Sequence, residues 1–238
     1  MNPTVARLTL RGLLGRRRLP LLIALPALLI AISVVVRLLS DVETSTANDV
    51  LAGFALSTMV PLIGVIAGTG AIGPEIDDGS IVYLLAKPVP RPTIILTKLV
   101  VAVTVTMAFA AVTTLWAGLV LTGTDQGIAV AYGAAALTSS VAYGAIFLLL
   151  AVVTRHAVVV GLVYALVWEG LLGGLVEGTK ALSVQQWSLA LAKEIADEGV
   201  VEASIGLPAA CVLLAAVSVA ATWYAGRRLR VLTLAGEE

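Results

Sequence analysis

The sequence predicts an all-α membrane protein with six transmembrane helices. Of the 238 residues, 59% are hydrophobic and 13% are charged, whereas a typical soluble domain is about 45–50% apolar and about 25% charged. The mean hydropathy of +1.03 points the same way. Uninterrupted apolar runs of 18 or more residues are typical of transmembrane helices. Six such runs are present, at residues 20–39, 50–73, 99–122, 128–153, 157–176 and 204–225.

Lys and Arg are distributed unevenly between the segments that join these spans. Twelve of the 15 fall before the first span, after the second, after the fourth or after the sixth. The other three, Arg37, Lys180 and Lys193, lie on the opposite side together with most of the acidic residues. Because Lys and Arg concentrate in cytoplasmic segments, both termini are predicted to be cytoplasmic.

Residues 2–18 are predicted to form an amphipathic helix that lies in the cytoplasmic interface. Its arginines, Arg7 and Arg11 among them, would face water while Val5 and Leu8 face the lipid. The alternative is a disordered basic tail that only sets the topology. The first apolar run is too long for a signal-peptide core and no small-residue cleavage site follows it, so it is expected to remain as a span.

The external segment 177–203 is predicted to contain a second amphipathic helix. Ser183-x-x-Gln186 has the form of a capping box, in which the side chains of both residues satisfy backbone N–H groups. After it, Val184, Trp187, Leu191 and Ile195 fall on one helical face. Such a helix could rest on the outer leaflet or close the outer mouth of the bundle.

Motifs for nucleotide binding and hydrolysis are incomplete in this sequence. Gly68-x-Gly70-x-x-Gly73 lies at the end of a span instead of following a strand. Together with Gly64 it is better explained by close packing of helices through small residues. The stretch "GGLVEGTK" at 173–180 reverses the Lys and Thr of a phosphate loop. No hydrolase motif is present, and the single Cys211 excludes disulfides within the chain.

The segment between the second and third spans, "GPEIDDGSIVYLLAKPVPRPTIILTK", combines acids, an apolar stripe and several prolines. Asp77 and Asp78 are expected to cap a short helix, and Gly79 allows the backbone to turn. Pro88 should end that helix. A rigid helix in this position suits contact with a cytoplasmic partner, although a helix that only anchors the spans would have the same composition.

The stretch "GAIGPEIDDGSIVYLLAKPVPRPTIILTKL" resembles the same region of type-2 ABC transporter permeases. "ARLTLRGLLGRRR" and "YALVWEGLLGGLVEGTKALSVQQWSLAL" are similar to other landmarks of that family, in the same order. The resemblance implies one transmembrane permease domain over residues 1–238, with a coupling helix that docks into a separate ATPase subunit. The docking residues that it implies are Glu75, Asp77, Asp78, Gly79, Ile81, Tyr83, Leu84 and Leu85.

The same resemblance implies a function for the whole chain. It would be the membrane subunit of an ATP-driven exporter in a bacterial inner membrane, working as a dimer with a second permease copy or a similar subunit. It would contact lipid, hold no cofactor of its own because the partner binds ATP, carry out no catalysis itself, and bind no nucleic acid. Two alternatives are a membrane assembly or anchoring factor and, with less support, a secondary transporter.

One carboxylate, Glu169, lies inside the predicted fifth span. An ionisable group in the membrane needs a partner or a water-filled cavity. It could line the translocation path or act as a proton-linked gate. It could equally be structural, by accepting bonds from backbone N–H groups of a neighbouring helix or by pairing with Arg37. We favour the structural hypothesis, because the surrounding Trp-Glu-Gly pattern is shared with the family whereas cargo varies.

Overall fold

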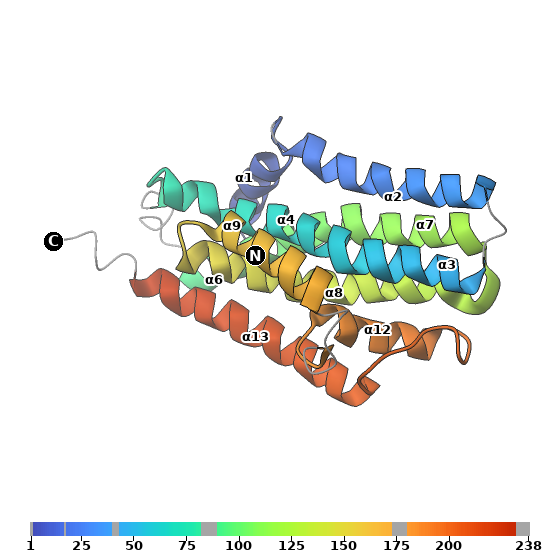
Figure 1. Cartoon of the computed structure of the whole chain (residues 1–238). Helices are drawn as coiled ribbons and strands as arrows, with labels where there is room; N and C mark the ends of the chain where they lie inside the picture. The colour runs from blue at the N-terminus through green and yellow to red at the C-terminus, as the bar shows by residue number, and fades with distance from the viewer. Residues whose placement is uncertain (1, 17, 40–42, 82–89, 173–179, 232–238) are drawn as a thin grey trace.

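The described part of the chain is an all-helical bundle (Figure 1). The structure is a computed structural model that describes all residues except 1, 17, 40–42, 82–89, 173–179 and 232–238. The helical segments in chain order are α1 (Pro3–Leu13), α2 (Leu19–Leu39), α3 (Thr44–Asn48), η1 (Asp49–Met59), α4 (Val60–Asp77), α6 (Arg91–Thr106), η2 (Met107–Ala111), α7 (Val112–Thr122), η3 (Asp125–Gly127), α8 (Ile128–Val153), α9 (Ala157–Val163), η4 (Tyr164–Leu172), α12 (Val184–Ile195) and α13 (Leu207–Val231).

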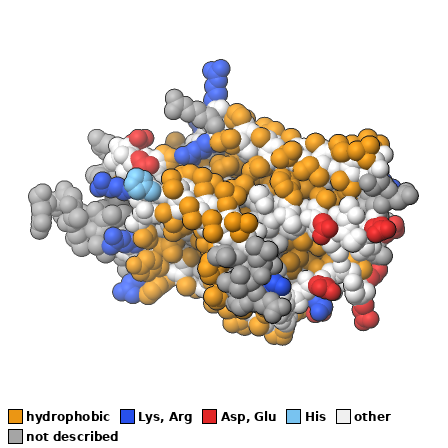
Figure 2. Space-filling model, in the orientation of Figure 1, with side chains coloured by type: hydrophobic (Ala, Val, Ile, Leu, Met, Phe, Trp, Pro, Cys, Tyr) orange, Lys and Arg blue, Asp and Glu red, His pale blue; other side chains and the backbone are white. Residues whose placement is uncertain are grey.

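Charged side chains gather at the two ends of the bundle. In the view of Figure 2, Lys, Arg and the single His lie mainly at the left end, and acidic side chains lie mainly at the right end. We call these the basic end and the acidic end. α1, the end of α4, the start of α6 and the end of α13 meet at the basic end, whereas α12 lies toward the acidic end (Figure 1). The separation of charge expected from the sequence is therefore present.

Among the residues that the structure describes, five helical stretches are long and apolar enough to cross a membrane. Four correspond to the first, second, third and fourth predicted spans, and the fifth stretch, Leu207–Leu229, corresponds to the sixth. The predicted span at 157–176 is shorter, an apolar helix over Ala157–Leu171. The last part of that prediction lies outside the described residues. The chain is thus an all-α, multi-pass membrane protein, as the sequence predicted.

Several spans contain stretches with wider helical turns. In η1, η2 and η4 the backbone makes π-type hydrogen bonds, which join residues i and i+5 instead of i and i+4. η1 continues without a break into α4, within one apolar helical stretch over Thr44–Asp77. η2 joins α6 to α7, and these three elements form a second stretch over Arg91–Thr122. These wider turns change which residues share a helix face, and η4 carries Glu169.

The centre of the bundle contains α4 and α8, which pack against each other more extensively than any other pair of described helices. Small residues permit this contact. A Cβ atom added at Gly64 would lie 3.0 Å from the Tyr143 Cβ, and one at Gly68 would lie 2.7 Å from the Phe147 Cβ. The prediction that these glycines serve helix packing is confirmed. α2 and α13 are peripheral: only 17% and 11% of their apolar windows are buried within the chain.

The second span differs from the prediction at its end. α4 continues through Pro74 to Asp77, and Asp78 occupies the position after its last residue. The expectation that Asp77 and Asp78 open a new helix is therefore wrong. The turn expected at Gly79 is confirmed, because its φ of +70° is a value that glycine adopts without steric cost. The predicted coupling helix lies mostly in 82–89, outside the described residues.

Candidate functional site

Two polar clusters in the described part of the bundle each contain a fully buried ionisable side chain. The first, at the basic end, joins α1, α4 and α6 around Lys98, and we call it the Lys98 cluster. Its members are Thr9, Ala71, Glu75 and Lys98. The second joins η4 to the start of α12 around Glu169, and we call it the Glu169 cluster. Its members are Tyr164, Glu169, Ser183, Val184 and Gln185.

The Lys98 side chain is fully buried and makes three polar contacts. Its Nζ donates to the Ala71 carbonyl oxygen at 2.6 Å and to Glu75 Oε1 at 2.7 Å. Thr9 Oγ1 lies 3.4 Å away and completes the set. A buried ammonium group is tolerated only when it is paired and hydrogen-bonded. Because Thr9 belongs to α1, Lys98 holds three helices together by one charge.

Arg18 donates a hydrogen bond to a backbone carbonyl group of α4 that Pro74 leaves without its helical partner. A proline has no N–H, so it leaves the carbonyl four residues earlier without its helical partner. That carbonyl belongs to Gly70, and Arg18 Nη1 donates to it at 2.9 Å. Burial lowers the pKa of Arg18 from its usual value, but a guanidinium keeps its proton at any physiological pH. Arg18 directly precedes α2, so the end of α4 is linked to the start of α2.

The amphipathic helix α1 lies against the ends of α4 and α6. Asn2 caps it, because its side chain accepts from the N–H groups of Thr4 and Val5. One face of the helix, formed by Val5, Thr9 and Leu13, is buried, whereas Leu8 is 56% exposed. The prediction of a helix is confirmed, but its buried face differs from the predicted apolar face and packs on protein.

Glu169 is fully buried and accepts four hydrogen bonds. The backbone N–H groups of Val184 and Gln185 donate to its oxygens at 3.0 and 3.4 Å. The hydroxyl groups of Ser183 and Tyr164 donate at 2.6 and 2.9 Å. The first N–H groups of a helix lack partners within the helix and favour negative charge. The carboxylate of Glu169 therefore caps the N-terminus of α12 from a different helix.

The geometry of η4 brings Tyr164 to this carboxylate. The two residues are five positions apart, and wider π-type turns bring residues at that spacing close to the same side of the helix. Tyr143, on α8, is also fully buried and lies beside the Glu169 carboxylate, although its hydroxyl makes no hydrogen bond of ordinary geometry within the described part of the chain. The Glu169 cluster thus connects η4 to α12, and α12 in turn packs on α8 and α13.

The sequence of the chain matches a known family over most of its length. The family described as "ABC-2 family transporter protein" matches residues 21–197. The chain belongs to this family. It is therefore a permease component of an ABC transporter, and family membership implies partnership with an ABC ATPase. No curated protein matches the chain significantly.

In this ABC-2 permease the predicted docking residues do not share one environment. Glu75 is 31% exposed and is paired with Lys98 inside the chain. Ile81 is buried against the permease's own core, so its side chain is not part of an exposed stripe. Asp77, Asp78 and Gly79 are exposed at the basic end. The remaining predicted docking residues, Tyr83, Leu84 and Leu85, lie outside the described residues.

Of the two structural partners suggested for Glu169, the structure of this permease brings one into contact with it and not the other. The backbone N–H groups of α12 contact it, whereas Arg37 lies elsewhere and donates to the Leu121 carbonyl oxygen at 3.0 Å. Ser183 accepts from the Gln186 N–H as the capping box predicted. Ile195 is 39% exposed, so the predicted apolar face of α12 does not hold over its last turn.

Sequence reasoning missed the role of Lys98 and Arg18, which it treated only as topology signals. An available signal was the position of Lys98 within the helix that carries the third span, where an unpaired charge is costly. Across the described ranges, no three His, Cys, Asp or Glu side chains gather as they would around a metal ion.

Proposed function

We propose that this permease is the membrane subunit of an ATP-driven exporter and that its basic end faces the cytoplasm and a separate ATPase. The family match carries the proposal. The sequence contains no complete phosphate loop, which fits ATP hydrolysis on another chain. The excess of Lys and Arg at the basic end supports the orientation. The permease would need no cofactor of its own.

The Lys98 cluster gives a physical route by which movement at the basic end would reach the spans. Arg18 and Lys98 hold the adjacent carbonyls of Gly70 and Ala71, near the end of α4. Arg18 leads directly into α2, and Lys98 belongs to α6. A force applied to the exposed surface at Asp77–Gly79 would therefore move α4 together with α2 and α6. Opening and closing of the path would follow from this joint movement.

A second permease copy would complete the translocation path. α9 and η4 carry a row of exposed aliphatic side chains, including Val159, Val163 and Leu166. One face of the described part of the fifth predicted span is therefore not covered by the rest of this chain. The same is true of the first span, of whose apolar window only 17% is buried. In a bilayer such faces contact lipid or another membrane helix. The Ala, Val and Leu that fill the spans favour an apolar or amphiphilic cargo.

Docking of the ATPase is tested by replacing Leu84 and Leu85 together with alanine. Complete burial of one Leu side chain stabilises a contact by about 1.5–3 kcal/mol, and about 1.4 kcal/mol corresponds to a tenfold change in affinity. We expect the double variant to lose the ATPase during purification, as measured by pull-down from solubilised membranes. The permease itself should still insert, because its spans are unchanged.

The matched control replaces two leucines that are exposed at the other end of a span, Leu38 and Leu39. This control should retain the ATPase. Replacing Gly79 by Val should leave the ATPase bound but separate hydrolysis from export, because a β-branched residue is strained at φ +70°. Undiminished binding by a normally expressed Leu84/Leu85 variant would show that docking depends on other residues.

A further inference from the structure

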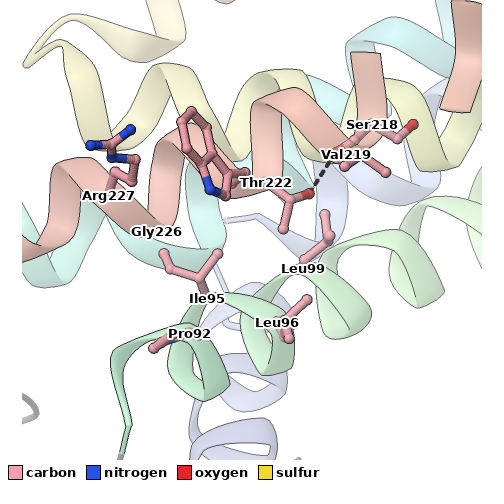
Figure 3. Close-up of a pocket in the computed structure, with 10 residues that line it drawn as sticks. Pro92, Ile95, Leu96, Leu99, Ser218, Val219, Thr222, Gly226 and Arg227 are labelled. Atoms are coloured by element: carbon pink, nitrogen blue, oxygen red, sulfur yellow. Dashed lines mark hydrogen bonds between the residues drawn. The ribbon is translucent and has the colours of Figure 1, made fainter. Parts of the chain in front are cut away.

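An apolar groove of about 720 Å³ runs between α6 and α13 on the outer surface of the bundle (Figure 3). This volume lies within the range of ligand pockets, about 300–1,000 Å³. Side chains of the two helices face each other across it (Figure 3). The lining residues are Pro92, Ile95, Leu96, Leu99, Ser218, Val219, Thr222, Trp223, Gly226 and Arg227.

The walls of this groove present few polar atoms to an occupant. The Ser218 hydroxyl donates to the Leu214 carbonyl oxygen at 2.7 Å, and the Thr222 hydroxyl donates to the Ser218 carbonyl oxygen at 2.7 Å. Both hydroxyl groups are therefore satisfied by the backbone of α13 itself. Their remaining surface is hydrocarbon, which suits an alkyl chain and offers no specific bond to a peptide.

The mouth of the groove at the basic end is cationic and aromatic. The Arg227 guanidinium lies 4.6 Å from the centre of the Trp223 ring and is exposed. Arg227 has no carboxylate partner within the described ranges. Trp and Tyr are enriched where a membrane protein meets the lipid headgroups, and Trp223 and Tyr224 are both exposed at this level. The mouth thus has the composition of a headgroup site.

The length of the groove corresponds to one lipid leaflet. From Ser218 to Arg227, α13 rises by about 14 Å at about 1.5 Å per residue. The hydrocarbon core of a bilayer is about 30 Å thick, so the groove extends from the headgroup level to about the middle of the membrane. One acyl chain of a phospholipid follows the same course.

We propose that this groove binds a single anionic phospholipid, with one acyl chain between α6 and α13 and the phosphate group on Arg227. Basic pockets between transmembrane helices are a known way of holding acidic headgroups. A second copy of the chain that packs through its own α13 fits the groove less well, because α13 carries exposed Arg227 and Arg228 but no acidic residue to pair with them. The proposal does not depend on export or on the ATPase.

The proposal is tested by native mass spectrometry of the purified full chain. The detergent-solubilised permease is mixed with equal amounts of phosphatidylglycerol and phosphatidylcholine that carry identical acyl chains. We expect one phosphatidylglycerol to be retained in preference to phosphatidylcholine. Replacing Arg227 by Gln should lower that retention about fivefold, the effect of one basic residue near anionic lipid. Arg228→Gln, the same change one residue outside the groove, is the matched control and should retain the lipid.

A second pair of variants tests the acyl chain. Thr222→Phe fills the middle of the groove and should reduce retention of both lipids, whereas Val212→Phe, on an exposed part of α13 outside the groove, should not. Thermal midpoints of all variants, measured in parallel, show which are folded, and Arg227→Lys provides a folded charge-retaining form that should keep the lipid.

Four outcomes would overturn the proposal. The first is equal retention of the two lipids by the unchanged chain. The second is equal loss in the Arg227 and Arg228 variants. The third is displacement of the lipid by excess inorganic phosphate, which would indicate an anion site without a bound acyl chain. Disulfide formation between two copies carrying Thr222→Cys would instead place a second permease in the groove, and this would also refute it.

Discussion

At the scale of single residues, the charged groups within the bundle act on backbone atoms that helix geometry leaves without partners. Glu169 accepts from N–H groups at the start of α12. Arg18 donates to the Gly70 carbonyl oxygen, to which Pro74 cannot donate because it has no N–H. In both cases the charge and the backbone group satisfy each other, which explains how ionisable side chains are tolerated among apolar helices.

Substitutions at Glu169 should separate a structural role from a role in transport. Glu169→Gln keeps one carbonyl oxygen and should preserve most of the thermal stability. Glu169→Leu leaves the N–H groups of Val184 and Gln185 without an acceptor, at about 1–3 kcal/mol for each buried group, and should lower the thermal midpoint clearly. Loss of transport in Glu169→Gln at unchanged stability would contradict the structural hypothesis and indicate that Glu169 carries protons or cargo.

Lys98 and Glu75 should behave as a pair. Glu75→Ala leaves the Lys98 ammonium without its carboxylate and should destabilise the chain by about 3 kcal/mol, the lower end for a broken buried pair. The double change Lys98→Met with Glu75→Leu removes both charges and should recover most of that loss. Denaturant unfolding of the three proteins in detergent measures the difference. If the single and double changes destabilise the chain equally, the cost of Glu75→Ala does not come from leaving the Lys98 ammonium unpaired.

At the scale of helices, the close contact between α4 and α8 depends on which glycines face the neighbouring helix. Gly68 lies against Phe147, whereas a Cβ atom at Gly73 would meet nothing within 4 Å. The two glycines belong to the same helix. They therefore differ in surroundings and not in secondary structure, which makes them a matched pair.

Gly68→Ala should destabilise the chain because it forces α4 and α8 apart, with a cost of about 1–3 kcal/mol for overpacking. Gly73→Ala should be neutral or stabilising by up to about 1 kcal/mol, since alanine is the better helix former. Thermal unfolding of both variants tests this. The packing explanation fails if the two substitutions have the same effect.

The helices themselves could be predicted because an apolar run of 18 residues is a local property of the sequence. The end of α4 could not. A proline normally interrupts a helix, and the group that compensates for Pro74, Arg18, is 52 residues away from its acceptor Gly70. The Lys98 cluster could not be predicted for the same reason, since the hydrogen-bond partners of Lys98 are 23, 27 and 89 positions away in the sequence. By contrast, the bond from the Gln186 N–H to Ser183 at the start of α12 lies within one short motif and was predicted.

At the scale of the whole molecule, the structure separates charge along the bundle axis, and this separation predicts how the bundle is oriented in the membrane. Exposed positions at each end allow this to be measured. Exposed Asp125, in η3, and exposed Glu198, after α12, belong to connections at the acidic end, whereas exposed Asp78 follows the end of α4 at the basic end (Figure 1). Ser183, although external in the predicted topology, is fully buried and is unsuitable for labelling.

Single cysteines at these positions, in a chain whose Cys211 is replaced by Ala, should report the orientation. We expect impermeant thiol reagents to label Asp125→Cys and Glu198→Cys in intact cells, and to label Asp78→Cys only after the membrane is opened. The reason is the excess of Lys and Arg at the basic end. Labelling of Asp78→Cys from outside would reverse the topology and with it the proposed position of the ATPase.

The cap that Glu169 places on α12 also has a consequence for biosynthesis. The fifth span leaves the ribosome before Ser183, Val184 and Gln185 do, so at that moment Tyr164 is the one hydrogen-bond partner of Glu169 named above that has emerged with it. A chain stalled with residue 180 just outside the ribosome would expose every apolar residue of that span together with a carboxylate that is still largely unsatisfied. We therefore expect stable insertion of the span to lag behind its synthesis until the next helix emerges. A series of stalled nascent chains, scored for membrane insertion before and after residue 185 has left the ribosome, would show the delay.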